Sequence, residues 1–384
     1  MTRGGPPVVG IVGAGQLARM MYQASISLAI PVRLLAADPT DGAARIASDV
    51  TIGAPDSLDA LRAFAASCDV VTFDHELVQP EHLRALEAEG VVLRPGAKTA
   101  AIVVDKREQR AAMARAGADV PKHSEVRAFG DIVSFGAASG WPLVLKAARG
   151  GYDGRGVWIV GGEDEARAVV EDLAGRPLIV EEFCAIEAEF AVQVARRPGG
   201  ESVTYPAVDT VQLDGVFRES VAPSALPSPV TSRASEIAVA IAEEIDCVGM
   251  LAVEFFVAGG RLLANELAAR PHNTAHYTIE GCVTSQFENH LRAVCDLPLG
   301  STRLTAPAVA TVNVFGPADG RDPAGMLPDL LSVDDAHLHL YGKPARSGRK
   351  LGHVTVCAAD RDEAIARART AASRVAGGIS GASR

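Results

Sequence analysis

Residues 144–160 read VLKAARGGYDGRGVWIV, a glycine-rich polar loop between two apolar runs. A Walker-type phosphate loop places Lys and Ser or Thr directly after its glycines and continues into a helix. Here Lys146 precedes the glycines, and the apolar run at 157–160 follows them. This order predicts a glycine-rich flap that joins two strands, and its bare backbone N–H groups suit an anionic ligand. A mobile hairpin tip without a ligand is the alternative.

Two acids farther along the chain are the next candidates. Glu254 lies in the apolar stretch GMLAVEFF and Glu266 in the next one, RLLANELA, with VAGG between them. A hairpin through VAGG would bring both carboxylates together across the strand pair. Adjacent acids need a counter-charge, and Mg²⁺ prefers a few carboxylate oxygens together with substrate phosphates. Asn265 would point away from Glu266 in a regular strand, so a role for it requires local twist. A surface carboxylate pair with lysine partners is the alternative, although this region has almost no lysine.

The segments around these features predict an α+β region with hairpins. PLVLKAA, VWIV, PLIVEEF and EFAVQVAR read as short strands, and EDEARAVVEDLAG and SPVTSRASEIAVAIAEEID read as helices. Glu181 and Glu182 end the third of these strands. A hinge there would suit an adenine and its ribose, and a salt-bridged strand end explains the two acids equally well.

The first hundred residues alternate strands with helices, which predicts a parallel sheet. VVGIVGAG, PVRLLAAD and DVVTFDHE read as strands, and QLARMMYQASISLA, SLDALRAFAASC and PEHLRALEAEG read as helices. A further helix, DKREQRAAMARAGADVP, has Asp105 as its expected N-cap. GAGQLA at 13–18, with Asp38 after the second strand, matches the dinucleotide fingerprint, so a nicotinamide-dependent oxidoreductase is one interpretation. A glycine turn before a helix equally suits another phosphate, or is only a tight turn.

The last part of the chain contains a cluster of cations. APAVATVNVFG, AHLHLYG and GHVTVCA read as strands and RDEAIARARTAASRVAG as a helix. The segment YGKPARSGRKLGH between the second and third strands contains Lys343, Arg346, Arg349, Lys350 and His353. Such a cluster in an acidic chain suggests a phosphate site, whereas a solvated basic turn is the alternative.

Composition limits the classes of function. The 384 residues carry a formal net charge of −10 with a pI of about 5.4, which disfavours a general nucleic-acid or membrane-surface binder. The six cysteines form no Cys-x-x-Cys pair, so reduced thiols are expected. No apolar run is long enough to span a membrane. These features predict a soluble cytoplasmic protein.

Several motifs together resemble a known family. GGYDGRG, NELAARPHNTAH, SQFENHLRAVCDLPLG and GRKLGHVTV are similar to those of the N5-carboxyaminoimidazole ribonucleotide synthases, in the ATP-grasp superfamily, as are GAGQLARMM and DKREQRAAMARAGADVP. The resemblance covers nearly the whole chain. It implies an α/β and α+β architecture with a Rossmann-like parallel-sheet domain at 1–104, an ATP-grasp domain at 105–299 with a glycine-rich lid at about 120–182, and a small C-terminal α+β domain at 300–384.

The resemblance also implies an activity and a set of residues. The enzyme would use ATP, Mg²⁺ and bicarbonate to carboxylate 5-aminoimidazole ribonucleotide through carboxyphosphate. The expected ATP contacts are Lys106, Lys146, Gly151, Tyr152, Asp153, Gly154, Arg155, Gly156, Val157, Glu181, Glu182, Phe183, Cys184, Glu189, Gln212, Asn265 and Glu266. The expected metal ligands are Glu254 and Glu266. The expected catalytic residues are Tyr152, Asp153, Arg155 and Arg270, and the expected substrate contacts are Gln16, Leu17, Glu76, Arg270, Asn273, Thr274, Lys343, Arg349 and Lys350.

The expected partners are a second copy of the chain, in a homodimer, and a separate downstream mutase. The chain departs from the family pattern at Asp74, in TFD where TFE is common, at Thr274, in HNTAH where HNSGH is common, and at Gln212, where a histidine is common. Other ATP-grasp carboxylases and a formate-using ribonucleotide transformylase are close alternatives, and a non-catalytic protein that binds MgATP is another.

Overall fold

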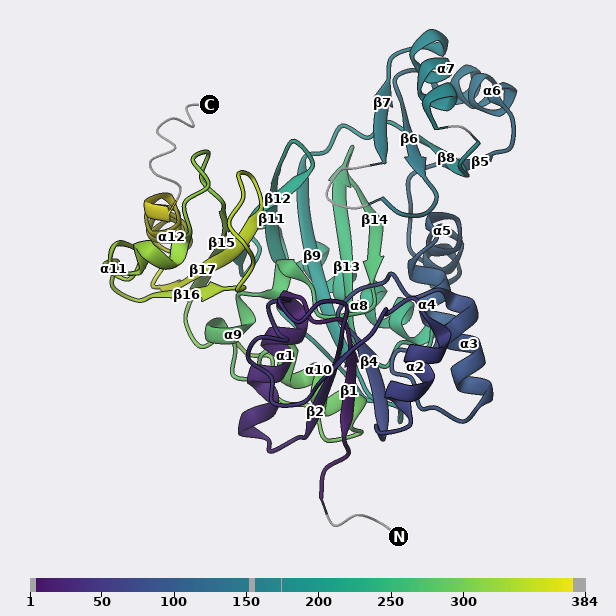
Figure 1. The fold of residues 1–384 in the computed structure, drawn as a ribbon. Helices are drawn as coiled ribbons and strands as arrows, with labels where there is room; N and C mark the ends of the chain where they lie inside the picture. Colours follow the sequence, from purple (N-terminus) through teal and green to yellow (C-terminus); the bar gives the residue numbers. More distant parts are fainter. Residues whose placement is uncertain (1–4, 152–155, 174, 376–384) are drawn as a thin grey trace.

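The structure, a computed structural model, describes residues 5–151, 156–173 and 175–375 (Figure 1). Its strands form three sheets of four, nine and four strands. In Figure 1 the sheet formed by residues 123–182 projects above the N-terminal domain. The C-terminal strands, within residues 308–358, lie on the opposite side of the central strands from that sheet. The described residues contain no helix that is long and apolar enough to cross a membrane.

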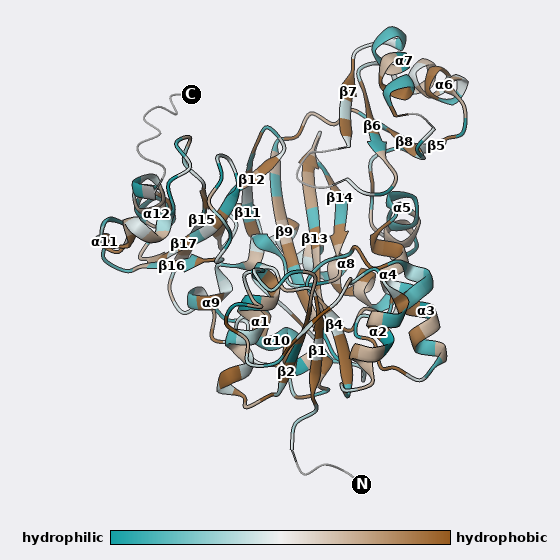
Figure 2. Cartoon of the chain, in the orientation of Figure 1, coloured by the Kyte–Doolittle hydropathy of each residue, from teal (hydrophilic) through white to brown (hydrophobic). Residues whose placement is uncertain are grey.

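The N-terminal domain has the parallel sheet that the sequence predicts, in the order β3-β2-β1-β4. Its strands are β1 (Val9–Val12), β2 (Val32–Ala36), β3 (Val50–Ile52) and β4 (Val70–Phe73), and its helices are α1 (Gln16–Ser27), α2 (Leu58–Ala65), α3 (Pro80–Ala88) and α4 (Ala97–Val103). Strands β1 and β4 are buried throughout and appear as hydrophobic in Figure 2. Sequence reasoning missed β3 and α4, which are short.

The lid is an antiparallel sheet in the order β5-β8-β6-β7. Its elements are β5 (His123–Val126), α6 (Phe129–Ser139), β6 (Leu143–Ala147), β7 (Val157–Val160), α7 (Glu163–Asp172) and β8 (Leu178–Glu182), and α5 (Lys106–Arg115) precedes them. Lys146 pairs with Val157 across β6 and β7. This pairing confirms that the glycine-rich loop joins two strands, although residues 152–155 lie outside the described part of the chain.

The central sheet runs in the order β14-β13-β9-β11-β12-β15-β17-β16, with β10 paired to β9. Its first part contains β9 (Ala188–Arg196), β10 (Ser202–Thr204), β11 (Val208–Leu213), β12 (Val216–Ala222), α8 (Ser228–Glu244), β13 (Gly249–Ala258), β14 (Arg261–Ala268), the 3₁₀ turn η1 (Asn273–Ala275), α9 (Thr278–Gly281) and α10 (Gln286–Val294). Its C-terminal part contains β15 (Ala308–Phe315), η2 (Pro323–Met326), α11 (Leu327–Leu330), β16 (Ala336–Leu340), β17 (Lys350–Ala358) and α12 (Arg361–Val375).

Pairing of β12 with β15 makes the C-terminal strands an extension of the central sheet. The α+β character expected for this part is present, but its strands share the large sheet. The amphipathic helix α8 covers the first part of this sheet, because its buried face, which includes Ile237 and Ile241, packs on Val192 and Val253. One face of this part of the sheet is therefore covered by α8.

Candidate functional site

A β-bulge on the β13–β14 hairpin arranges the predicted acids. Glu254 pairs with Glu266, but the next residue, Phe255, pairs with Ala264. Asn265 is therefore the extra residue on β14, and a bulge of this kind turns a side chain out of regular alternation. Asn265 and Glu266 line the same cavity as a result. This is the local irregularity that the sequence argument required.

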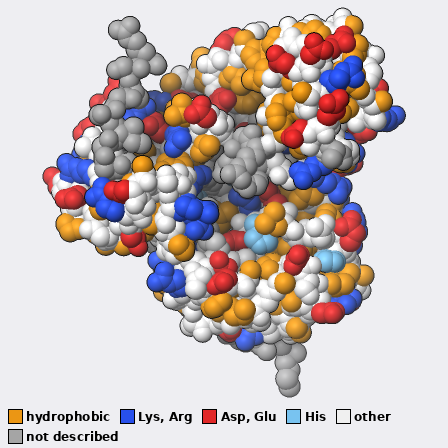
Figure 3. Space-filling model, turned by 45° about the horizontal axis from the view of Figure 1, so that its top comes forward, with side chains coloured by type: hydrophobic (Ala, Val, Ile, Leu, Met, Phe, Trp, Pro, Cys, Tyr) orange, Lys and Arg blue, Asp and Glu red, His pale blue; other side chains and the backbone are white. Residues whose placement is uncertain are grey.

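That cavity has a volume of about 550 Å³ and lies between the lid and the central sheet (Figure 3). One part of its wall is apolar and consists of Val144, Val157, Ile159, Phe183, Ile186 and Phe256. Other parts of its wall carry Lys106 and Lys146 beside the acids Glu254 and Glu266. A slot with an apolar portion and a separate set of cations suits a base attached to a polyphosphate.

A buried ion network joins the lid to the hairpin. Lys146 Nζ lies 2.7 Å from Glu181 Oε2 and 3.2 Å from Asn265 Oδ1. Arg110 Nε donates to the other Glu181 oxygen at 2.6 Å. Burial alone would raise the pKa of Glu181, but Arg110 and Lys146 outweigh it and lower that pKa to about 2. Each oxygen of Glu181 is thus bonded to a cation within the protein, which favours the salt-bridged strand end over a ribose contact as the explanation for this acid.

The two acids of the hairpin are in a different state. Burial, followed by the charges of Glu266 and Glu189, raises the pKa of Glu254 to about 8. Burial also opposes ionisation of Glu266, but Lys106, whose Nζ lies 3.0 Å from Glu266 Oε1, lowers its pKa overall. His272 Nε2 lies 3.8 Å from Glu254 Oε1, and burial followed by the charge of Arg270 lowers the pKa of His272 to about 3. Neutral His272 supplies no counter-charge to Glu254.

These acids fit a magnesium site that a nucleotide completes. Among the described residues no group of three or more His, Cys, Asp or Glu side chains is arranged to hold a metal ion. Glu254 and Glu266 are a pair, and Mg²⁺ is commonly held by one or two carboxylates plus substrate phosphates. A cation bound between these acids would offset the burial and the like charges that raise the pKa of Glu254.

A second cavity, of about 930 Å³, lies between the N-terminal domain and the hairpin. Gln16 and Leu17, both predicted substrate contacts, line it at the start of α1. The two cavities share five lining residues, which are Glu76, Lys106, Gly151, Glu266 and Arg270. Arg270 Nε lies 3.4 Å from Glu76 Oε1, with both side chains largely buried. A ligand in either cavity therefore reaches the same charged residues.

The start of α1 is occupied by an acid of the protein itself. Asp74 Oδ2 accepts a hydrogen bond from Gly15 N at 2.5 Å. A Cβ on Gly13 would lie 1.9 Å from Asp74 Oδ1, so glycine is required there. The Asp74 carboxylate would oppose a pyrophosphate at this helix end, and Asp38 is already bonded to Thr40 N at 2.7 Å. The Asp74 contact therefore weakens the dinucleotide interpretation, whereas Gln16 and Leu17 line the second cavity and stay predicted substrate contacts.

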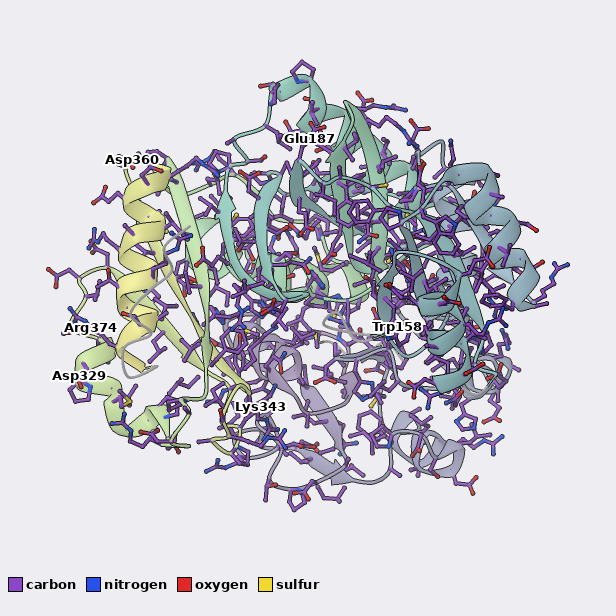
Figure 4. The ribbon with its side chains drawn as sticks, turned by 90° about the horizontal axis from the view of Figure 1, so that it is seen from above. Trp158, Glu187, Asp329, Lys343, Asp360 and Arg374 are labelled. Carbon is purple, nitrogen blue, oxygen red and sulfur yellow. The ribbon has the colours of Figure 1, made fainter. Side chains whose placement is uncertain are left out.

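The predicted cation cluster lies at the edge of the second cavity. Lys343 Nζ donates to Gln16 Oε1 at 2.5 Å and joins the C-terminal part to α1 (Figure 4). Lys350 Nζ lies 5.9 Å from the centre of the Phe217 ring, and Arg349 Nη1 donates to Pro344 O at 3.3 Å. Of these residues only Gln16 is part of the cavity wall. The structure therefore brings the lysines near the predicted substrate site without placing them in it.

The remaining predicted residues divide into four groups. The first cavity is lined by Glu182, Cys184, Glu189, Gln212 and Asn273, as well as by those already described. Thr274 is buried instead, and its Oγ1 bonds to Gln193 and His272, so it supports the turn and does not face a ligand. Gly156 closes the loop with φ +82°. Tyr152, Asp153, Gly154 and Arg155 lie outside the described residues.

Sequence reasoning missed Arg110. It lies in a motif that was recognised, yet nothing in the spacing marked it as part of the site. The available signal was a charged residue three positions before Met113 on the buried face of α5. A cation there must have a buried partner.

Comparisons with known proteins agree with this geometry. Three family models match, namely the ribonucleotide synthetase preATP-grasp domain at residues 7–104, the ATP-grasp domain at 111–287 and the phosphoribosylaminoimidazole carboxylase C-terminal domain at 310–367. N5-carboxyaminoimidazole ribonucleotide synthase from Mycobacterium tuberculosis is 42% identical over 377 residues, covering 95% of this chain and 87% of the relative. The enzyme of the same name from Corynebacterium ammoniagenes is 41% identical, covering 96% and 92%.

Solved structures show the same likeness. The ADP complex of an N5-carboxyaminoimidazole ribonucleotide synthetase matches with a TM-score of 0.89 at 31% identity, covering 97% of this chain and 98% of that one. The Aspergillus clavatus N5-carboxyaminoimidazole synthase in complex with ADP and 5-aminoimidazole ribonucleotide matches with a TM-score of 0.88 at 31% identity, covering 96% and 98%. The likeness therefore extends over nearly the whole chain.

Proposed function

Since this chain belongs to the family of N5-carboxyaminoimidazole ribonucleotide synthases, we propose that it carboxylates 5-aminoimidazole ribonucleotide at the expense of ATP. The products are N5-carboxyaminoimidazole ribonucleotide, ADP and phosphate, and bicarbonate is the source of carbon. This places the enzyme in purine biosynthesis. The observation that carries the proposal is the meeting of two cavities at one set of charged residues.

The first cavity is the proposed ATP site. Its apolar wall accepts the adenine, and Lys146 and Lys106 lie on the side where phosphates would be bound. Glu254 and Glu266 are the proposed ligands of Mg²⁺, which when bound offsets the charge that spreads over a transferring phosphoryl group. Asn265, held beside Lys146, offers an amide to the same phosphates.

The second cavity is the proposed ribonucleotide site. Arg270 and Glu76 stand where it meets the first cavity, next to the position of the γ-phosphate that Lys106 and Glu266 imply. Gln16 lies in its wall on the side of the N-terminal domain, and Lys343 bonds to Gln16 there. We assign the phosphate of the ribonucleotide to this side, because the cations there belong to a chain that is acidic elsewhere.

The proposed chemistry has two steps. A bicarbonate oxygen attacks the γ-phosphorus, the bond to the β-phosphate oxygen breaks, and ADP leaves carboxyphosphate behind. Carboxyphosphate breaks down to CO₂ and phosphate, and the exocyclic amine of the aminoimidazole bonds to the carbon of CO₂ while its proton passes to phosphate. Lys106 and Arg270 stabilise the anions at the junction of the cavities. Closure of the lid keeps water from the anhydride.

We also propose the family's associations for this chain. They are a homodimer in the cytoplasm and a separate mutase that acts on the product. The resemblance of the sequence motifs to that family implies the dimer. Light scattering coupled to size-exclusion chromatography tests it, and a monomeric mass at working concentration argues against it.

An omission assay tests the function. Phosphate release is measured with ATP, bicarbonate and 5-aminoimidazole ribonucleotide, and then with each left out in turn. Full release is expected only with all three present. Release with formate in place of bicarbonate would indicate a transformylase, binding of MgATP without release would indicate a non-catalytic protein, and oxidation of reduced nicotinamide would revive the dehydrogenase interpretation.

A further inference from the structure

Arg110 is the largest fully buried side chain of the described residues, and nothing about the two ligand cavities required it. Its side chain is 1% exposed, in helix α5 below the lid. It lines neither cavity. A buried guanidinium is costly unless every N–H group finds an acceptor. The identity of those acceptors therefore indicates what the residue does.

The acceptors of Arg110 belong to two separate elements. Its Nε donates to Glu181 on the lid strand β8, at 2.6 Å. Its Nη1 donates to the backbone carbonyl of Asn265, and its Nη2 lies 3.5 Å from Asn265 Oδ1. Asn265 is the bulged residue of β14, so one planar group holds both the lid and the bulge.

Lys146 closes the network into a ring. It bonds to the second oxygen of Glu181 and to Oδ1 of Asn265, at 2.7 and 3.2 Å. The two groups proposed to face the ATP phosphates, Lys146 Nζ and the Asn265 amide, are thus both fixed through partners of Arg110. A carboxylate that bonded Lys146 alone would be free to draw the ammonium group away from the cavity.

We propose that Arg110 is a positioning residue for ATP, which locks Lys146 and Asn265 in place and joins the lid to the central sheet without touching the nucleotide. The inference rests on the ATP site proposed above. Lysine cannot replace it, because an ammonium group lacks the rigid fork that reaches Glu181 and the Asn265 carbonyl together. The ribonucleotide site contains no partner of Arg110, so a substitution of Arg110 leaves the affinity of that site for the ribonucleotide unchanged.

Two substitutions and a matched control test the proposal. Arg110→Gln and Arg110→Lys remove the fork, and Arg115→Gln removes an arginine of the same helix that pairs with Glu244 at the surface, at 2.6 Å. The kcat and the KM for ATP and for 5-aminoimidazole ribonucleotide are measured with the full chain. Calorimetric titration with Mg²⁺ and a non-hydrolysable ATP analogue gives nucleotide affinity without turnover, and thermal unfolding reports on the fold.

We expect Arg110→Gln to lower kcat/KM for ATP by about 100-fold and Arg110→Lys by about 10-fold, since a small displacement of phosphate ligands has effects of this size. The KM for the ribonucleotide should stay within about twofold in both, and Arg115→Gln should match the wild type, as expected for a surface pair. Weaker binding of the ATP analogue should accompany the loss of kcat/KM for ATP. A folded Arg110 variant with wild-type kcat/KM for ATP, or an equal loss for both substrates, overturns the proposal.

A double variant distinguishes a loss of positioning from a loss of folding. Arg110→Gln combined with Glu181→Gln removes the carboxylate that the single change leaves short of a partner, so it should fold even where Arg110→Gln alone does not. Its analogue affinity is expected to remain low, and recovery to the wild-type value overturns the positioning role. The proposed function is tested separately, because wild-type turnover in the omission assay does not depend on any of these variants.

Discussion

Glu181 and Glu254 are two buried glutamates in the wall of one cavity, and their environments are opposite. Glu181 has a cation on each oxygen, and its pKa falls to about 2. Glu254 faces other acids, and its pKa rises to about 8. Burial acts in the same direction on both, so the neighbouring charges alone make the difference.

This contrast distinguishes the part of the site whose charges are balanced within the protein from the part whose charges we propose a ligand to balance. Arg110 and Lys146 neutralise Glu181 within the protein, so the charge of this carboxylate is balanced without a ligand. In the pair of Glu254 and Glu266, Glu266 is bonded to Lys106, whereas Glu254 faces the acids Glu266 and Glu189 and its pKa stays raised. A metal ion that arrives with ATP would supply positive charge there. Each prediction below changes one side of this contrast.

The largest effect is expected for Glu266→Gln. Removing this charge takes away a proposed metal ligand and the partner of Lys106, so kcat should fall by about 1,000-fold or more. The fold should survive, because the remaining Glu254 is then relieved of a like charge. Steady-state phosphate release and thermal unfolding measure the two quantities, with Glu81→Gln, an exposed acid paired with Arg84, as the control. Turnover close to that of the wild type would remove Glu266 from the site.

Lys146→Met instead removes one of the two cations that neutralise Glu181. We expect kcat/KM for ATP to fall by about 100-fold, with the KM for the ribonucleotide unchanged. The free energy of unfolding should also fall, by about 2 kcal/mol, because buried Glu181 keeps only Arg110 as a partner. Chemical denaturation measures the stability and initial rates measure the activity. Loss of activity without loss of stability would mean that Arg110 alone neutralises Glu181.

Much of this contrast was readable in the sequence. The order of Lys146, glycines and a strand predicted the flap, and the spacing of Glu254 and Glu266 around VAGG predicted the pair, because hairpin pairing is local. The bulge at Asn265 was recognised only as a requirement, since a one-residue register shift leaves no composition signal.

Other features depended on contacts between distant segments. Arg110 and Glu181 are 71 positions apart, and Asp74 reaches Gly15 across 59 positions. The short strand β3 and the short helix α4 were also missed, because three and seven residues are too few for a periodic pattern. The Asp74 contact matters most, because it places a carboxyl group of the protein on the Gly15 amide of the turn that GAGQLA forms.

The pH dependence of stability should reveal Glu254 directly. Its pKa is higher in the folded protein, about 8 against 4.5, so the folded state holds more protons between these values and stability falls as pH rises. The pKa of His272 is lowered from 6.5 to about 3. This residue therefore makes stability rise with pH, but only below pH 6.5. Between pH 6.5 and 8 the ligand-free protein should therefore lose stability, on the order of 1 kcal/mol.

Thermal unfolding across that window, with and without Mg²⁺ and ADP, checks this prediction. The slope should disappear in Glu254→Gln, which cannot ionise, and should weaken when metal and nucleotide supply the missing charge. A slope that persists in Glu254→Gln would assign the pH dependence to another group.

The smallest effect is expected where a pair resembles that of Glu181 and Arg110 in chemistry but not in burial. Glu182, the next residue along β8, pairs with Arg261 at 3.0 Å, and the Arg261 side chain is 44% exposed. Water already solvates that guanidinium, so Arg261→Gln should change the free energy of unfolding by less than about 0.5 kcal/mol and kcat/KM for ATP by less than about twofold. Denaturation and initial rates measured beside Arg110→Gln make the comparison. If the two variants lost equal activity, burial would not be what distinguishes the two arginines, and the charge of the lid strand as a whole would have to be considered instead.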